Sequence, residues 1–319
     1  MASAGGPALE DGLKVVKDPE LESLLGTFAK ACKDIARALS TSLVTSVGTS
    51  NKFGDVQLTV DVIADKIMFA EAEKCGLVKA AASEEEPELK ELVEGGRYVV
   101  CWDPLDGSSI VDCNWTVGTI IAIWKIGANG FEWKGKDSLI GVTGRQQVAS
   151  MLAVYGPRAT LLVTGNNIAP QEYTLQAADQ WILSRPTTSI APSGAKIFAP
   201  ANLRANQDSV AYRKLIEYWL EKRYTLRYTG GLVPDVYQLF VKGQGVFCNP
   251  ASDKAPAKLR LVFECAPIAF LIEAAGGKTT VGGEKSVLDV AIEKMEHRLP
   301  MCCGTAEEVD RFEAFLKAN

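Results

Sequence analysis

The sequence contains a single histidine, His297, which lies in a charged segment near the C-terminus. Zinc sites built from several imidazoles and hydrolases that use a Ser-His-Asp triad are therefore poorly supported. The eight cysteines are scattered and include no CxxC pair of the kind that binds zinc. We expect reduced thiols, with Cys101 and Cys113 among those in or near the core. Any acid–base chemistry must fall to carboxylates or to water.

Excess basic charge and long apolar runs are also missing. The formal net charge is −5 at pH 7, so the sequence lacks the excess of Lys and Arg that nucleic-acid binding requires. No segment approaches the ~20 apolar residues that span a bilayer. The first residues are small and acidic, with no signal or transit peptide visible. We predict a cytoplasmic protein with no nucleic-acid or membrane partner, and a disordered tail over residues 1–17.

Apolar sequence, by contrast, is abundant. The chain has 319 residues, of which 47% are hydrophobic, and this is near the size at which one core divides into two. Apolar and polar segments alternate along the chain, which favours an α/β enzyme. The Pro- and Ser-rich stretch 185–194 is the best boundary. We therefore predict two α/β domains, over residues 18–190 and 191–319.

Two aspartates at the end of a predicted strand are the most informative feature of the chain. The apolar run 98–101 is followed by Trp102-Asp103-Pro104-Leu105-Asp106-Gly107-Ser108-Ser109. Carboxylates in this position can hold hard divalent cations, and the N–H groups of a Gly-Ser-Ser turn can receive phosphate oxygens. A metal and a phosphate at one place indicate phosphoryl chemistry.

A second acidic group follows the preceding strand, which we place over residues 78–82. That strand leads into Ser83-Glu84-Glu85-Glu86. Such a triplet is more often a solvated turn than a metal site when it stands alone. Adjacent strands of an open α/β sheet, however, bring their carboxyl ends to one edge, so these residues could meet the two aspartates. Four carboxylates in one place repel each other strongly unless cations or protons neutralise them.

Helical spacing adds two more acidic residues. A helix over residues 57–74 places Asp61 and Asp65 on one face, four residues apart. The preceding segment, residues 46–55, is rich in turn-forming residues and is predicted to be a mobile surface loop that contains Asp55. Loops of this kind often close over substrates.

A long helix is predicted over residues 258–275, with a kink at Pro267. It places Arg260 and Glu264 on one face. This spacing forms an ordinary salt bridge or, if that face meets the acidic cluster, makes Glu264 a fifth metal ligand. Residues 146–155 are also predicted to be helical.

Four blocks stand in a recognisable order along the chain: Ser83-Glu84-Glu85, Asp103-Pro104-Leu105-Asp106-Gly107-Ser108-Ser109, Arg227-Tyr228-Thr229-Gly230-Gly231 and Lys258-Leu259-Arg260-Leu261-Val262-Phe263-Glu264. Together they resemble the fructose-1,6-bisphosphatase family of metal-dependent, lithium-sensitive sugar phosphatases. The segment Ser108-Ser109-Ile110-Val111-Asp112 looks most like the sedoheptulose-1,7-bisphosphatase branch of that family. The resemblance covers roughly residues 18–315 and implies alternating helix and sheet layers in an αβαβα sandwich.

The resemblance also implies a role for each matching residue. The implied metal ligands are Glu84, Asp103, the Leu105 carbonyl, Asp106 and Glu264. The residues implied to act on the attacking water are Asp61 and Glu85, with Asp55 joining from its loop. The implied substrate-binding residues are Gly107, Ser108 and Ser109 at the phosphate to be cleaved, and Asn202, Arg227, Tyr228, Lys258 and Arg260 around the sugar and the distal phosphate. In this scheme the N-terminal domain binds metal and the C-terminal domain binds substrate.

The activity that the resemblance implies is that of a phosphoric monoester hydrolase with two to three Mg²⁺ ions per active site, or Mn²⁺ in their place. The expected reaction is hydrolysis of the C1 phosphate of sedoheptulose-1,7-bisphosphate, by direct in-line attack of metal-activated water. A fructose-1,6-bisphosphatase or a dual-specificity enzyme is the alternative, and a nonenzymatic metal- or phosphosugar-binding protein is less favoured. A homodimer is expected, with a homotetramer as the alternative, because the arginine matching Arg227 often reaches a neighbouring subunit's site.

Overall fold

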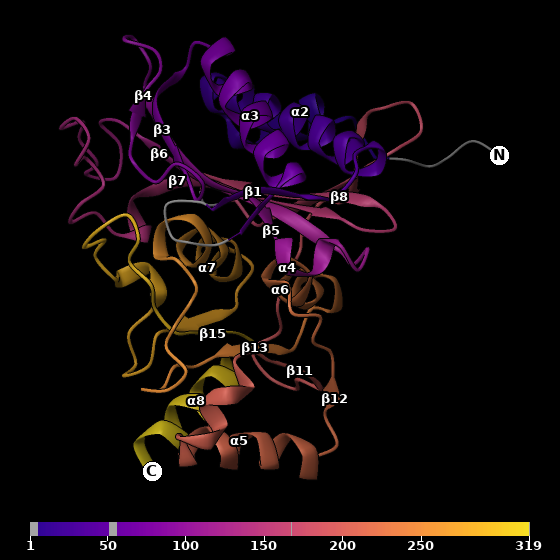
Figure 1. Ribbon diagram of the computed structural model, residues 1–319, viewed down its shortest axis with the longest axis vertical. Coiled ribbons are helices and arrows are strands. Elements are labelled where there is room, and N and C mark those ends of the chain that lie inside the picture. Colours follow the sequence, from indigo (N-terminus) through magenta and orange to yellow (C-terminus); the bar gives the residue numbers. More distant parts are fainter. Residues whose placement is uncertain (1–5, 51–55, 167, 319) are drawn as a thin grey trace.

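The computed structural model describes residues 6–50, 56–166 and 168–318, and its elements form five alternating layers (Figure 1). From one side to the other these are a helical layer, the larger sheet, a second helical layer, the smaller sheet and a third helical layer. The helices, in that order of layers, are α2 (Pro19–Thr41) and α3 (Thr59–Lys74), then α6 (Leu232–Lys242) and α7 (Ala266–Ala274), then α5 (Val210–Glu221) and α8 (Ala306–Ala318). The predicted αβαβα sandwich is confirmed.

The larger sheet has eight strands in the described part of the chain, in the order β10-β9-β8-β7-β6-β5-β3-β4. The strands are β3 (Val78–Ser83), β4 (Lys90–Glu91), β5 (Tyr98–Asp106), β6 (Val117–Lys125), β7 (Gln147–Tyr155), β8 (Ala159–Gly165), β9 (Gln171–Leu175) and β10 (Trp181–Arg185). β3 and β5 run parallel, and Ser83 lies opposite Trp102. Glu84 and Asp103, which follow these two residues, therefore lie side by side at one edge, as the sequence predicts.

The smaller sheet has the order β12-β11-β13-β15-β14. Its strands are β11 (Ile197–Pro200), β12 (Thr225–Leu226), β13 (Val246–Asn249), β14 (Lys278–Thr280) and β15 (Met301–Gly304). One hydrophobic core joins the two sheets and includes Ile120 of β6, Phe247 of β13 and Leu271 of α7. The two halves of the chain are thus intimately packed, and the division at residues 190 and 191 stays a prediction.

Local sequence explains how α2 begins and which side it buries. The Asp18 side chain accepts a hydrogen bond from the Leu21 N–H at 3.2 Å, and Pro19 occupies the first turn, where no intrahelical N–H is needed. Leu21, Leu24 and Phe28 recur at helical spacing and are fully buried. Among the described residues, none of the helices combines the length and the apolar character needed to cross a membrane.

The predicted disordered tail over residues 1–17 is wrong for the part that the structure describes beyond Gly6. Residues Leu9–Gly12 form α1, and Leu13–Val16 form a 3₁₀ turn. Leu9, Leu13 and Val16 are buried, and the Leu183 N–H of β10 donates to the Pro7 carbonyl at 3.0 Å. The acidic residues of this segment favoured the prediction of disorder, but its apolar residues recur at helical spacing and pack beside the edge strand β10.

The helix predicted over residues 146–155 is also wrong, since Gln147–Tyr155 is the strand β7. Every residue of β7 is buried, and its mostly apolar sequence lacks the alternation that identifies a half-buried strand. Part of the predicted loop 46–55 is likewise a strand, because β1 (Ser46–Ser50) pairs with β2 (Val56–Leu58). Cys113, expected near the core, is exposed in the turn after α4 (Ser108–Val111).

The long helix predicted from residue 258 begins only at Leu261. It opens with a π-helical turn, Leu261–Cys265, and continues as α7, with Pro267 in the first turn of α7. Arg260 instead lies opposite Arg298 in an isolated antiparallel bridge. Long-range pairing thus removes three residues from the predicted helix, and π-helical turns are frequent at functional sites.

Candidate metal centre and phosphate pocket

A cavity of about 720 Å³ opens at the edge of the larger sheet where β3 and β5 end. Its wall combines acidic side chains with the basic residues Lys258, Arg260 and Arg298, which come from segments between β13 and β15 in the sequence. The predicted site residues that line it are Asp61, Glu84, Glu85, Asp103, Leu105, Ser108, Ser109, Lys258, Arg260 and Glu264. The predicted convergence of distant acidic segments is therefore present.

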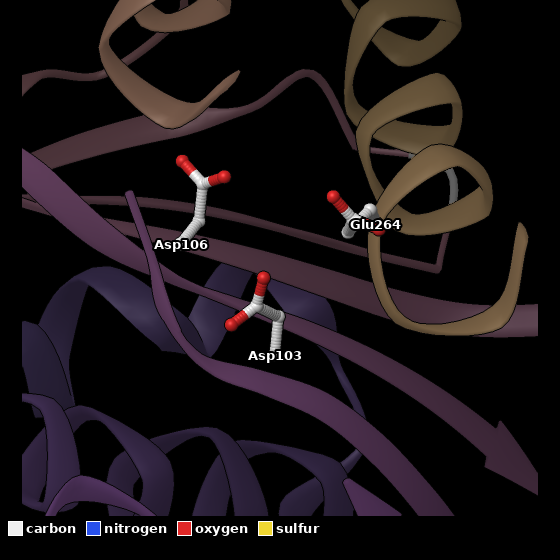
Figure 2. Close-up of side chains that lie close together, drawn as sticks. All are labelled: Asp103, Asp106 and Glu264. Carbon is white, nitrogen blue, oxygen red and sulfur yellow. The ribbon is translucent and has the colours of Figure 1, made fainter. Parts of the chain in front are cut away.

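Three buried carboxylates form the centre of this site. Asp103, Asp106 and Glu264 each offer an oxygen, and these oxygens lie within 4.8 Å of one another. Figure 2 shows the side chains approaching from β5 and from the helix on the opposite side of the site. The three residues are 4%, 9% and 5% exposed, so water screens them poorly.

Backbone N–H groups hold each of the three carboxylates in place. The Leu105 N–H donates to Asp103 Oδ1 at 2.9 Å, and the Val233 N–H at the start of α6 donates to Asp106 Oδ2 at 2.7 Å. The Arg260 N–H donates to Glu264 Oε2 at 2.5 Å. Hydrogen bonds of this kind to charged oxygens are strong and directional, so the acidic side chains are preorganised.

The clustered carboxylates hold their protons more tightly than isolated ones. Burial, with the nearby charge of Glu84, raises the pKa of Asp103 and of Glu264 well above the ordinary range. Burial raises the pKa of Asp106 to about 7, although the Val233 N–H opposes the rise. Without a compensating charge, the centre would therefore hold protons near neutral pH.

A divalent cation fits this donor set. The oxygens are hard ligands, they are buried, and their mutual repulsion favours either protons or a metal ion. Asp61 Oδ1 is a further buried oxygen that has no hydrogen-bond partner among the described residues. Carboxylate and carbonyl oxygens suit Mg²⁺ and Mn²⁺, whereas softer metals prefer thiolate or imidazole ligands. The residues present thus match the metal dependence that the sequence implies.

Glu84 and Arg260 form an ion pair inside the cavity. Arg260 Nη1 lies 2.6 Å from Glu84 Oε1 and 3.8 Å from Glu264 Oε2, and the Arg260 side chain is 7% exposed. Glu84 also contacts Asp103 and raises the pKa of that carboxyl. The predicted ligand Glu84 is thus adjacent to the three-carboxylate centre, with Arg260 offsetting part of the negative charge.

Asp61 lies at the start of α3 and faces the same cavity. Its Oδ2 accepts a hydrogen bond from the Leu58 N–H at 2.9 Å. Burial, followed by the charges of Glu85 and Glu84, raises its pKa to about 7. A carboxylate with this pKa can accept a proton from water near neutral pH.

Five predicted residues lie outside the lining of the cavity, and a sixth lies outside the described residues. Asp106 is one of the five, although its carboxylate lies beside those of Asp103 and Glu264, which do line the cavity. The Asn202 amide donates to the carbonyls of Pro250 and Ala255 at 2.8 and 3.0 Å, so it ties two loops together. Arg227 and Tyr228 are exposed beside β12, and Gly107 caps α4 with a φ of 97°. Asp55 lies outside the described residues.

Sequence reasoning missed Arg298, which lines the cavity opposite Arg260. The Leu261 N–H donates to the His297 carbonyl at 2.7 Å, and the Leu299 N–H donates to the Leu259 carbonyl at 3.1 Å. These bonds bring the segment 297–299 to the site. Its charged sequence resembles a solvated turn, so no local signal could have identified Arg298.

The layered fold, with buried carboxylates at a sheet edge and basic residues across the cavity, defines a metal-dependent phosphatase of the sugar-phosphatase type. The sequence profile described as "Fructose-1-6-bisphosphatase, N-terminal domain" matches residues 9–186, and that described as "Fructose-1-6-bisphosphatase, C-terminal domain" matches residues 191–317. The chain belongs to the fructose-1,6-bisphosphatase family, whose members are phosphoric monoester hydrolases.

Individual relatives come from two branches of this family. A chloroplastic sedoheptulose-1,7-bisphosphatase of Triticum aestivum is 44% identical, over 98% of this chain and 77% of its own length. A class 1 fructose-1,6-bisphosphatase of Citrifermentans bemidjiense is 39% identical, over 94% and 88%. A crystal structure from Toxoplasma gondii, assigned provisionally as a sedoheptulose-1,7-bisphosphatase, is 51% identical with a TM-score of 0.93, and the match covers 98% of this chain and 99% of that one.

Proposed function

We propose that this protein hydrolyses the C1 phosphate of sedoheptulose-1,7-bisphosphate to give sedoheptulose-7-phosphate and phosphate. The observation that carries the proposal is a cavity in which Asp103 and Glu264, two members of the three-carboxylate centre, meet the Ser108–Ser109 turn and the basic residues Lys258 and Arg260. Such a site can hold a phosphate group between cations and N–H donors.

The identities of the relatives support the seven-carbon substrate. The named sedoheptulose-1,7-bisphosphatase of Triticum aestivum matches more of this chain, at higher identity, than the named fructose-1,6-bisphosphatase of Citrifermentans bemidjiense. A fructose-1,6-bisphosphatase is therefore the less favoured alternative. A nonenzymatic role is also disfavoured, because the proposed proton acceptor, Asp61, lies in the same cavity as the carboxylates Asp103 and Glu264 of the proposed metal centre.

We propose that Glu84, Asp103, the Leu105 carbonyl, Asp106 and Glu264 hold two to three Mg²⁺ ions, with Mn²⁺ as a substitute. Bound there, the metal supplies charge that neutralises the phosphate and lowers the pKa of water. The N–H groups of Gly107, Ser108 and Ser109 orient the phosphate. They are suited to this because the first N–H groups of a helix have no intrahelical partner.

Asp61 and Glu85 have the task of orienting the attacking water and accepting its proton. Asp61 has a pKa of about 7 because burial and the charges of Glu85 and Glu84 disfavour its anion. The water attacks phosphorus in line with the departing sugar oxygen, without a covalent intermediate. Asp55, from the preceding loop, joins these residues in the proposal.

Recognition of the distal phosphate is the role that we propose for Lys258, Arg227, Tyr228 and Asn202. A guanidinium can bind a phosphate through two parallel hydrogen bonds, so Arg227 would favour a bisphosphate over a monophosphate. Because Arg227 is exposed and outside the cavity lining, we propose that it acts on a neighbouring copy's site. A homodimer is the simplest such assembly, with a homotetramer as the alternative. Cytoplasmic location is our prediction, whereas the named plant relatives are described as chloroplastic.

Steady-state phosphate release tests the proposal directly. Sedoheptulose-1,7-bisphosphate and fructose-1,6-bisphosphate are compared over a range of Mg²⁺ concentrations, with and without EDTA. Asp103→Asn protein, purified in the same way, controls for contaminating phosphatases. We expect a higher kcat/KM for the seven-carbon substrate and no activity in EDTA. A higher kcat/KM for the six-carbon substrate would refute the assignment, and release that persists in EDTA would refute the metal mechanism.

A further inference from the structure

Asp65 is a buried carboxylate on α3 that the proposed chemistry does not use. It lies one helical turn after Asp61 and is 7% exposed. Its Oδ1 accepts a hydrogen bond from the Trp102 indole N–H at 2.9 Å. The Ser83 hydroxyl lies near the same carboxylate, and both neighbours oppose the rise in the pKa of Asp65 that burial causes. A buried charge needs such partners, so these contacts are strongly favoured.

The two partners of Asp65 occupy equivalent places on adjacent strands. Ser83 of β3 and Trp102 of β5 lie opposite each other in the parallel ladder. The residues that immediately follow them are Glu84 and Asp103, which line the acidic cavity. Asp65 thus joins the two strands at the last positions before the proposed metal ligands begin.

Asp65 acts from the opposite face of the sheet. Successive side chains of a strand point to opposite faces, so Trp102 points toward α2 and α3, while Asp103 points to the other side. Trp102 is fully buried and contacts Phe69 with ring centroids 4.7 Å apart. Its carbonyl accepts a hydrogen bond from the Glu84 N–H at 3.0 Å. The position of Trp102 therefore sets the backbone positions of both acidic residues.

We infer that Asp65 is a positioning residue, which holds Trp102 and Ser83 so that Asp103 and Glu84 keep the spacing needed to bind a divalent cation. The inference rests on the proposed metal centre. Partners that orient metal ligands typically contribute about 10- to 100-fold in metal affinity. Loss of the Asp65 carboxylate should therefore lower the affinity for a divalent cation in a protein that still folds.

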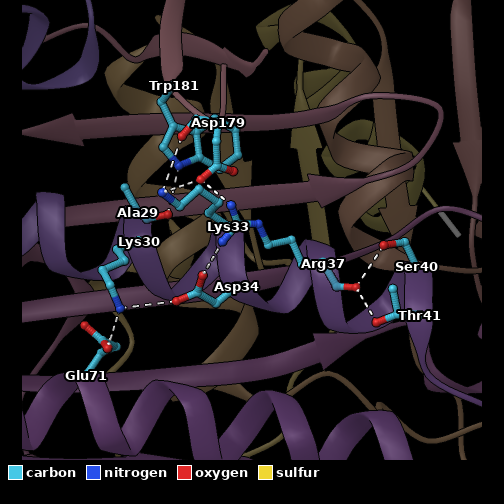
Figure 3. A network of polar contacts seen from close by, with 10 residues as sticks. All are labelled: Ala29, Lys30, Lys33, Asp34, Arg37, Ser40, Thr41, Glu71, Asp179 and Trp181. Carbon is cyan, nitrogen blue, oxygen red and sulfur yellow. Dashed lines mark hydrogen bonds and ion pairs between the residues drawn. The ribbon is translucent and has the colours of Figure 1, made fainter. Parts of the chain in front are cut away.

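The test measures Mn²⁺ binding to the full chain by electron paramagnetic resonance, independently of catalysis. Asp65→Leu removes the hydrogen bond from Trp102 and the polar contact with Ser83 at similar volume, whereas Asp65→Asn keeps an oxygen that can accept from Trp102. Glu71→Leu is the matched control, because Glu71 is an acidic α3 residue that pairs with Lys30 of α2 at 2.6 Å, away from the strand ends (Figure 3). Trp102→Phe removes the indole donor and keeps an aromatic ring in the core.

We expect the dissociation constant for Mn²⁺ to rise about 10-fold or more in Asp65→Leu and severalfold in Trp102→Phe. Asp65→Asn and Glu71→Leu should bind Mn²⁺ like the parent. In activity assays, the Mg²⁺ concentration for half-maximal rate should rise in Asp65→Leu, while KM for the sugar changes little. A purely structural role would instead lower stability in Asp65→Leu without changing Mn²⁺ affinity.

Parent-like Mn²⁺ affinity in folded Asp65→Leu would overturn the inference. If Asp65→Leu does not fold, parent-like Mn²⁺ affinity in Trp102→Phe would overturn it. A parent protein that binds Mn²⁺ but does not release phosphate from sedoheptulose-1,7-bisphosphate would refute the proposed substrate and leave the Asp65 comparison intact. A parent that takes up no Mn²⁺ would overturn both.

Discussion

Removal of divalent cations should make the stability of this protein depend steeply on pH. Burial raises the pKa of Asp106 from 3.8 to about 7, and that of Asp103 and Glu264 is raised as well. Between about pH 4 and pH 7, the folded chain therefore holds protons that the unfolded chain has released. Since the unfolded state binds fewer protons, the free energy of unfolding falls as pH rises through this range.

The size of the effect follows from Asp106 alone. A change of about 3 in pKa corresponds to ~4 kcal/mol between the protonated and ionised states. Asp106 is 9% exposed, so screening by water reduces this little. About half of this change, ~2 kcal/mol, falls between about pH 5.5 and about pH 8, so at roughly 2 °C per kcal/mol for a chain of this size Tm should fall by on the order of 4 °C over that interval. Mg²⁺ should reverse the loss, because it binds only the ionised folded carboxylates.

Thermal unfolding of EDTA-treated protein at about pH 5.5 and about pH 8, each with and without added Mg²⁺, measures both effects. We expect Mg²⁺ to raise Tm much more at the alkaline pH than at the acidic pH. Asp106→Asn, which cannot ionise at this position, is the control and should reduce the pH dependence to the part that comes from Asp103 and Glu264. Equal Tm values at both pH values in EDTA, or a Mg²⁺ effect independent of pH, would refute the reasoning.

Three further substitutions address separate parts of the site. Asp103→Asn removes a shared charge and should lower kcat by on the order of 10³-fold with an unchanged circular dichroism spectrum, so an active variant would contradict the metal assignment. Asp61→Asn should abolish the rise of kcat/KM with pH near the Asp61 pKa of about 7. If kcat/KM of the variant still rose in this pH range, another group would be the proton acceptor. Arg227→Ala should raise KM for the bisphosphate by about 10-fold or more and leave a sugar monophosphate nearly unaffected. Equal effects on both substrates would rule out recognition of the distal phosphate by Arg227.

Elements with a clear local signal were predictable from the sequence. The α2 helix carries its own cap at Asp18 and an apolar face. The strand β5 ends in carboxylates, which are costly to bury unless a metal ion or another partner compensates their charge. The strand β7 was not predictable, because burial on both faces removes alternation from its sequence. The first residue of the helix predicted from Lys258 was not predictable either, since the Arg260–Arg298 bridge that delays its start depends on a distant part of the chain.

The sequence by itself determined the chemistry available to this protein: acidic oxygens in short motifs, almost no histidine, and a family pattern along most of the chain. Only the tertiary structure decided which of these groups meet. It brings Glu264 to Asp103 and Asp106, pairs Glu84 with Arg260, and sets Asp65 against Trp102. The physical reason is that residue types and short spacings are local properties, whereas distances between remote segments depend on how sheets and helices pack throughout the molecule.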